Sequence, residues 1–213
     1  FASLYISQSA TLFVVISERN SAVAAAAASL FQQRHPGDSI LLRTPRQLEA
    51  MDDAAIARQL RDADVVVIAG VFSDDATRIN RLISSSSIAA AFFAVSSTQS
   101  LVEQSQLNLG RDQLLWSSIN DYWQGRGVEN LVNLFSFAIG DARARELLAP
   151  PRQLEPVRMS TRQGEASAPL VILFDYETGD LVGNQDLHDA VCEELVRNGL
   201  ACRSVYADWG GAS

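Results

Sequence analysis

Short apolar runs alternate with helix-like stretches along the first half of the chain. The runs are rich in Val, Ile, Leu and Phe, as expected for strands buried on both faces. They span 11–16, 39–43, 64–70 and 89–95. The stretches that follow the first three runs predict helices at 21–34, 45–61 (with a break at Met51-Asp52) and 74–86. Such alternation with short connections predicts parallel strands joined by right-handed crossovers.

The pattern changes after residue 96. Helices are predicted over 118–124 and 128–148, and four of the six prolines then fall within 150–169. A new unit follows, with a strand at 170–174, a helix capped by Asn184 that ends at Gly199, and a strand at 201–206.

The predicted fold class is therefore α/β. We expect a doubly wound, mostly parallel N-terminal domain, Rossmann- or flavodoxin-like, over 1–149 with helices at its C-terminal end. Residues 150–168 are expected to be a linker with weak protection from hydrogen exchange. Residues 169–213 are expected to be the truncated start of a second α/β domain.

Charge and motif content exclude several function classes. The 213-residue chain has a formal charge of −8, so it has no general attraction for nucleic acid or anionic membranes. All 17 cationic residues are arginine, which excludes a P-loop ATPase or a lysine Schiff-base enzyme for these residues. Neither a G-x-G-x-x-G nor a G-x-x-x-x-G-K-[ST] motif is present.

Candidate ligand-binding residues follow the predicted strands, because open α/β sheets bind ligands beyond the carboxyl ends of their strands. These ends lead into 17–19, 70–75 and 96–98. Asp74 and Asp75 are interpreted as acidic residues at a helix N-terminus, with a ligand or metal contact as the alternative.

The histidines and cysteines do not form a recognisable site in the sequence. His35 is expected to have a structural role at a helix end, and His188 to lie on a solvated helix face. Cys192 and Cys202 are expected to be buried free thiols that bind no metal, with a disulfide as the alternative. No Ser-His-Asp arrangement is evident, and we assign no catalytic residue and no metal ligand.

Two segments resemble one known family. Residues 119–134, INDYWQGRGVENLVNL, are similar to the Y-x-x-x-G-G-x-x-N-L-x-N-L segment of the cobaltochelatase large subunit and the related magnesium chelatase H subunit. The glycine step reads Gly125-Arg126-Gly127 here. Residues 169–176, Gly183-Asn184 and the helix to Gly199 resemble the next segment of that family.

The resemblance implies the N-terminal portion of a large subunit that binds a tetrapyrrole and supports ATP-dependent insertion of a divalent metal. Cobalt into a corrin precursor is the first choice, and magnesium into protoporphyrin the second. AAA-type ATPase and adaptor subunits would act as partners and hydrolyse the ATP. The insertion site would lie further along the larger protein, so these residues would carry no cofactor of their own.

The candidates for contact with the macrocycle are Tyr122, Trp123, Tyr176 and Asn184. Packing of Tyr122 and Trp123 over the turn at Gly125–Gly127 is the alternative interpretation. The alternative function is a stand-alone sensing domain that binds a small ligand at the ends of the first and third strands.

The compartment is expected to be the cytoplasm. A signal peptide removed ahead of Phe1 would instead place the chain in the periplasm. No apolar run approaches the ~20 residues that a membrane-spanning helix needs.

Overall fold

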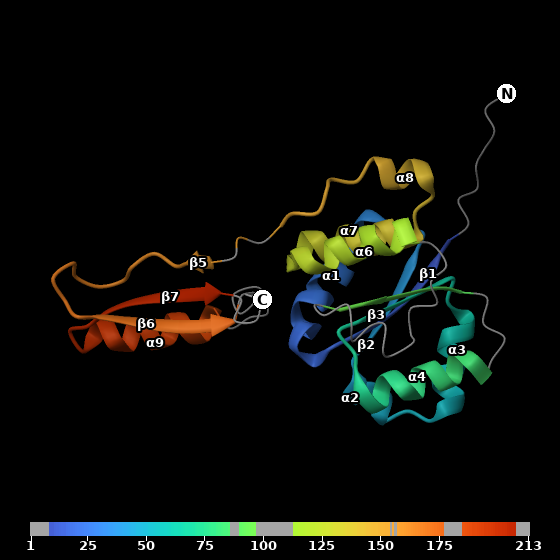
Figure 1. Cartoon of the computed structure of the whole chain (residues 1–213), viewed down its shortest axis with the longest axis horizontal. Coiled ribbons are helices and arrows are strands. Elements are labelled where there is room, and N and C mark those ends of the chain that lie inside the picture. The colour runs from blue at the N-terminus through green and yellow to red at the C-terminus, as the bar shows by residue number, and fades with distance from the viewer. Residues whose placement is uncertain are drawn as a thin grey trace. The chain divides into compact units, whose positions relative to one another are not determined.

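In the computed structural model the chain divides into two units, Phe1–Arg152 and Gln153–Ser213 (Figure 1). The structure describes residues 9–85, 90–96, 113–153, 155, 157–176 and 185–207. Each unit has a β-sheet of its own.

The first unit is built on a four-stranded parallel sheet with the order β2-β1-β3-β4. Its strands are β1 (Thr11–Ile16), β2 (Ser39–Arg43), β3 (Val65–Ala69) and β4 (Ala91–Val95). Phe13 of β1 is in register with Leu41 of β2 and Val66 of β3. The parallel α/β fold predicted from the alternating pattern is confirmed.

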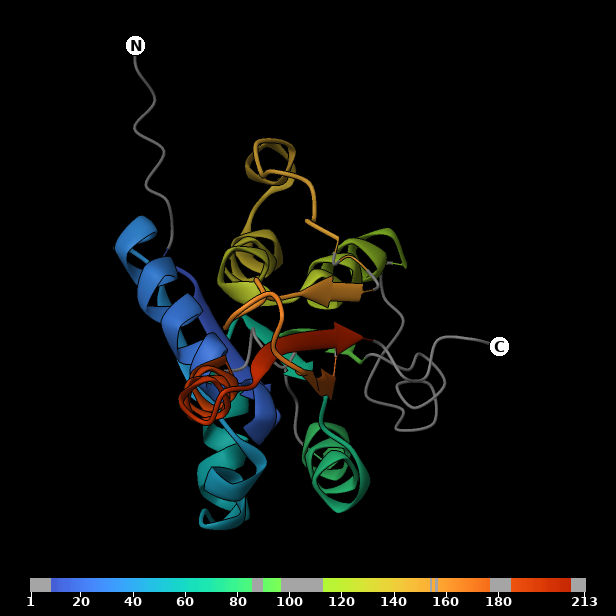
Figure 2. The same cartoon turned by 90° about the vertical axis from the view of Figure 1, so that its left-hand side faces the viewer.

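Helices cover both faces of this sheet. They are η1 (a 3-10 helix, Glu18–Asn20), α1 (Ser21–Arg34), α2 (Pro45–Glu49), α3 (Asp53–Asp62), α4 (Ser73–Ser85), α6 (Gln113–Gly125), α7 (Gly127–Ile139) and α8 (Ala142–Glu146). Figure 1 shows α6 and α7 on one side of the sheet and α3 and α4 on the other. α1 packs against α7, where Phe31 meets Phe135 edge to face at 6.1 Å. α8 lies on the outer side of α7 (Figure 2).

The core lies between the sheet and its helices. All five residues of β3 and all but the first of β1 are buried, because these strands lie in the middle of the sheet and helices cover both of its faces. Burial of each large apolar side chain contributes about 1.5–3 kcal/mol. Ile40 and Leu42 are only partly buried, since β2 is an edge strand.

Local capping decides where the helices end. The predicted break in 45–61 is present: Thr44 forms a capping box with Gln47 at the start of α2, and Asp52 caps α3. The predicted helix 128–148 is instead interrupted at Gly140, whose backbone is extended. Asp141 then accepts a hydrogen bond from the Ala144 amide and starts α8.

The second unit contains a three-stranded mixed sheet with the order β5-β7-β6. Its elements are β5 (Val157–Met159), β6 (Leu170–Tyr176), α9 (Gln185–Arg197) and β7 (Ala201–Ala207). β6 and β7 are parallel, and β5 pairs antiparallel with β7.

The interpretation of 150–168 as a linker missed β5. This strand has only three residues, too few to show an apolar alternation, and its order comes from pairing with a strand more than forty residues later. An additional bridge joins Gln163 to Cys202.

Within the described ranges, every helix is too short or too polar to cross a lipid bilayer.

Candidate functional site

The carboxyl edge of the first sheet contains the topological switch between β1 and β3, where open α/β sheets bind ligands. Ser17 follows β1 and donates its amide hydrogen to the Ala69 carbonyl over 3.1 Å. Gly70 follows β3 with φ +65°, and a Cβ there would lie 3.3 Å from both the Ser17 Oγ and the Trp123 Cζ2. The strand ends and the indole are therefore closely packed.

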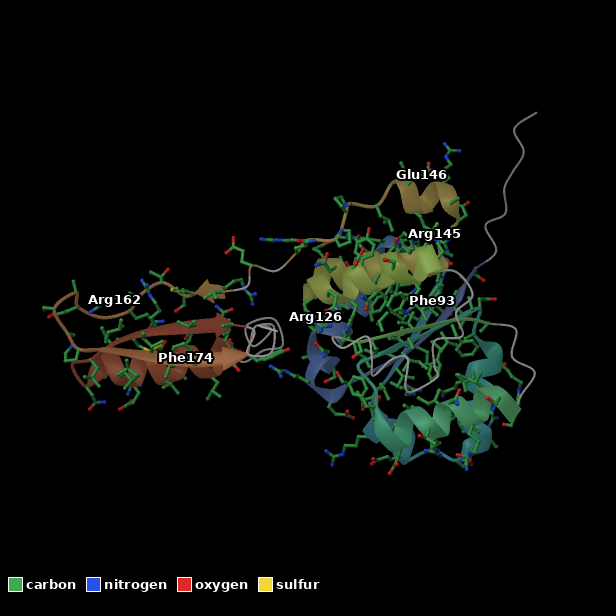
Figure 3. The ribbon with its side chains drawn as sticks, viewed as in Figure 1. Phe93, Arg126, Arg145, Glu146, Arg162 and Phe174 are labelled. Carbon is green, nitrogen blue, oxygen red and sulfur yellow. A yellow bond between two sulfur atoms is a disulfide. The ribbon has the colours of Figure 1, made fainter. Side chains whose placement is uncertain are left out.

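Trp123 closes this edge from α6. Its side chain is 2% exposed, and the Arg126 guanidinium lies 4.1 Å from the ring centroid. Arg126 joins α6 to α7 (Figure 3) with φ +52° and donates from Nη1 to the Trp123 carbonyl over 2.9 Å. Among the described residues, the Trp123 Nε1–H is buried without a hydrogen-bond partner. A buried donor left in this state costs about 1–3 kcal/mol.

Acidic side chains lie near the same edge. Burial acts to raise the pKa of Glu18, but hydrogen bonds from the Arg46 amide (2.8 Å) and Thr44 outweigh it and lower that pKa. Burial raises the pKa of Asp75, and the negative charges of Glu49 and Glu18 raise it further. Asp74 and Asp75 lie in the first turn of α4, as the sequence predicted.

The family-like segment of α6 and α7 holds the end of the first unit in place. The Tyr122 hydroxyl donates to the Ala149 carbonyl over 2.7 Å. The Asn130 Nδ2 donates to the Arg152 carbonyl over 2.8 Å, and its Oδ1 accepts from the Arg152 amide over 3.0 Å. A Cβ at Gly125 would lie 2.3 Å from that same carbonyl oxygen, so glycine is required there.

The four candidate residues for macrocycle contact are divided between the two units, with Tyr122 and Trp123 in the first and Tyr176 and Asn184 in the second. Tyr122 and Trp123 are 4% and 2% exposed, so neither ring forms a surface platform, and burial raises the pKa of the Tyr122 hydroxyl. Tyr176 is partly buried at the end of β6, and Asn184 lies outside the described residues. Their contact with a macrocycle stays a prediction.

The second unit contains an Asp-His-Ser cluster that the sequence did not reveal. The His188 Nδ1 lies 3.0 Å from the Ser204 Oγ, and its Nε2 lies 3.5 Å from an Asp175 carboxylate oxygen. The ring also stacks on Tyr206 with centroids 5.4 Å apart. The prediction of a solvated His188 was wrong, because this face of α9 packs on β7.

This cluster does not have the arrangement of a nucleophilic triad. Ser204 is only 2% exposed, and its backbone exchanges hydrogen bonds with Ser160. A nucleophilic serine must present its Oγ to a substrate. The contacts instead attach the first turn of α9 to the sheet.

Cys192 and Cys202 form a disulfide, so the prediction of free thiols was wrong. Gly199, with φ +76°, reverses the chain so that α9 runs back along β7. The two Cα atoms lie 5.2 Å apart, within the range that a disulfide requires. The spacing of ten residues gave no sign of this geometry.

Chemistry-bearing groups are sparse in the described part of the chain. No three His, Cys, Asp or Glu side chains there are grouped to hold a metal ion. A groove of about 430 Å³ in the second unit is lined by Gly164, Val196, Leu200 and other residues. Its one ionisable lining residue is Glu165, which is too little for an acid–base site.

Comparison with known proteins identifies a similar structure. The chain resembles the catalytic subunit of cobaltochelatase from Mycobacterium tuberculosis, with a TM-score of 0.53 and 19% sequence identity. The similarity covers 93% of this chain but only 16% of that subunit. No protein-family model matches the chain. A search of curated proteins gives no match either.

Proposed function

We propose that this chain is part of the large subunit of a metal chelatase that binds a tetrapyrrole and supports ATP-dependent insertion of a divalent metal. The observation that carries the proposal is the structural similarity over 93% of the chain, which extends across both units. The resemblance of residues 119–134 to the same family supports it independently of the fold.

Cobalt insertion into a corrin precursor is the first choice, and magnesium insertion into protoporphyrin is the second. Insertion requires the metal to lose water and the macrocycle to lose two pyrrole protons, which needs clustered ligands and a base. Since the described residues contain no such cluster, we assign them a scaffold role. ATP would be hydrolysed by AAA-type ATPase partners with their adaptor subunits.

The test is a metal-dependent change in the absorption spectrum of the corrin precursor or of protoporphyrin. Full-length polypeptide, cobalt or magnesium, ATP and the partner subunits should give turnover, and the 213-residue chain should not replace the full-length polypeptide. Absence of turnover with both metals and both macrocycles would refute the proposal. Turnover by the 213-residue chain would refute the scaffold role.

Small-ligand binding at the ends of β1 and β3 is a second candidate function. It is favoured by the buried Trp123 N–H, which lacks an acceptor among the described residues at the switch point. The indole N–H signal of Trp123 can be followed by nuclear magnetic resonance during titration with nucleotides or tetrapyrroles. Trp116, whose Nε1 donates to the Ala94 carbonyl over 2.7 Å, is the internal reference. A shift confined to Trp123 would support this candidate, and no shift would exclude the ligands tested.

A further inference from the structure

One face of the second sheet is apolar and exposed. The opposite face packs on α9, since Cys202 and Ser204 of β7 contact Cys192 and His188 of that helix. Side chains alternate along a strand, so Arg203 of β7 lies on the face away from α9.

Strand register identifies the other members of this face. Ile172 of β6 is in register with Arg203, and both Phe174 of β6 and Met159 of β5 are in register with Val205. We call this surface the open face and define it by Val157, Met159, Leu170, Ile172, Phe174 and Arg203. Phe174 can be located on β6 in Figure 3.

The exposure of the open face is unusual for its architecture. Ile172 is 44% exposed, Met159 61% and Phe174 62%. Parallel strand pairs joined by a helix normally have both sheet faces covered, as β1 and β3 have in the first unit. The second unit has α9 on one face, and an equivalent layer on the open face would complete it.

Arg203 indicates the chemistry of that missing layer. It lies on β7, the middle strand, and its Nε is buried. Among the described residues the Nε has no hydrogen-bond partner, and none of their arginine–carboxylate ion pairs involves Arg203. A guanidinium surrounded by apolar side chains is best stabilised by a carboxylate that accepts its N–H groups.

We propose that an amphipathic helix packs on the open face and places an Asp or Glu, within its apolar stripe, against Arg203. The inference rests on the proposed function in one respect: the helix belongs to the remainder of the large subunit. A helix is the expected occupant because right-handed crossovers place helices on both faces of such sheets.

Charge argues against two other occupants. Two copies of this chain packed open face to open face would bring Arg203 near its own symmetry mate, and like charges in an apolar contact are unfavourable. A lipid surface is disfavoured because the chain carries a net charge of −8.

Methionine oxidation provides the test, because the chain has one methionine on the open face and one elsewhere. Met159 is 61% exposed, whereas Met51 is partly buried against the core of the first unit. We expect peroxide to oxidise Met159 at least five times more slowly in the full-length polypeptide than in the 213-residue chain. Met51 should react equally in both.

Charge reversal tests the carboxylate. In the full-length polypeptide, Arg203→Glu should restore fast Met159 oxidation, while Arg203→Lys should keep most of the protection. Arg197→Glu is the matched control, because Arg197 is an exposed α9 residue paired with Glu194. Unchanged Met51 oxidation and an unchanged circular dichroism spectrum would show that each variant is folded.

Three results would overturn the inference. Met159 could react equally fast in both polypeptides, the 213-residue chain could protect it in a concentration-dependent way, or protection could survive Arg203→Glu. The second result would identify a second copy as the occupant. A metal-insertion assay on the same preparations separates the two proposals. Protection of Met159 in a full-length polypeptide that supports no metal insertion would refute the chelatase function but not the helix on the open face.

Discussion

The Asn130 carboxamide exchanges two hydrogen bonds with the backbone of Arg152, at 2.8 Å and 3.0 Å. Asn130 lies in the first turn of α7, whereas Arg152 is the last residue of the first unit. Together with the bond from Tyr122 to the Ala149 carbonyl, this pair attaches residues 149–152 to α6 and α7. The family-like asparagine therefore determines where the chain leaves the first unit.

Substitution of Asn130 by alanine should lower the free energy of unfolding by about 1–3 kcal/mol, because it leaves the Arg152 amide and carbonyl without their partners. Asn133→Ala is the matched control, since Asn133 lies in the same helix but is only partly buried, whereas Asn130 is buried. Urea unfolding of both variants measures the difference. Equal losses for the two variants would show that the carboxamide bonds do not hold this segment.

Arg78 connects three elements of the other helical layer. Its guanidinium donates to Asp53 over 2.8 Å, to the Leu48 carbonyl over 2.8 Å and to the Met51 carbonyl over 2.7 Å. We expect Arg78→Ala to lower the free energy of unfolding by about 2–4 kcal/mol, because the substitution removes all of these charged hydrogen bonds at once.

Arg81 provides the control for Arg78. It also pairs with Asp53, at 2.7 Å, but its side chain is 65% exposed. Exposed ion pairs contribute about 0–1 kcal/mol to stability, so Arg81→Ala should lower the free energy of unfolding by no more than that amount. Thermal unfolding compares the two variants, and a loss for Arg81→Ala as large as that for Arg78→Ala would contradict this account.

The first sheet could be predicted from sequence because its signals are local. Each strand is a continuous apolar run, and capping residues such as Thr44 and Asp52 mark the helices between them. β5 was missed because its order depends on pairing with β7, which no local pattern encodes. The break at Gly140 was also missed. The apolar spacing of this segment favours one continuous helix, but Asp141 caps a new helix there instead.

The candidate residues were harder to predict than the fold. Aromatic residues at a turn suggested either a ligand platform or packing, and only tertiary structure shows that Tyr122 and Trp123 are buried. The contacts of His188 with Asp175 and Ser204 join residues from two strands and a helix. Their spacing in sequence has no helical or strand period, so no motif could identify them.

Reduction of the Cys192–Cys202 disulfide should destabilise the second unit. With a sequence separation of ten residues, loop-closure entropy predicts a loss of about 3 kcal/mol. Amides of β6 and β7 should exchange faster in the Cys192→Ser, Cys202→Ser double variant, while those of β1 and β3 should be unaffected. Unchanged exchange in β6 and β7 would show that α9 is held mainly by the contacts of His188.

The raised pKa of Asp75 predicts a pH-dependent effect of its removal. Burial and the negative charges of Glu49 and Glu18 raise the pKa of Asp75 in the folded protein above its ordinary value of 3.8. The stabilisation by protonated Asp75 is therefore fully present below pH 3.8 and is lost as the pH rises through the raised pKa. Asp75→Asn stays neutral, so its stability relative to the wild type should increase between about pH 4 and pH 7. Urea unfolding across this range measures the trend.

Asp74→Asn is the control, because it removes an exposed carboxylate from the same first turn of α4. Its stability relative to the wild type should not increase with pH, because the charge of Asp74 is favourable at the helix N-terminus. A relative stability of Asp75→Asn that falls as the pH rises would contradict the assigned direction of the shift.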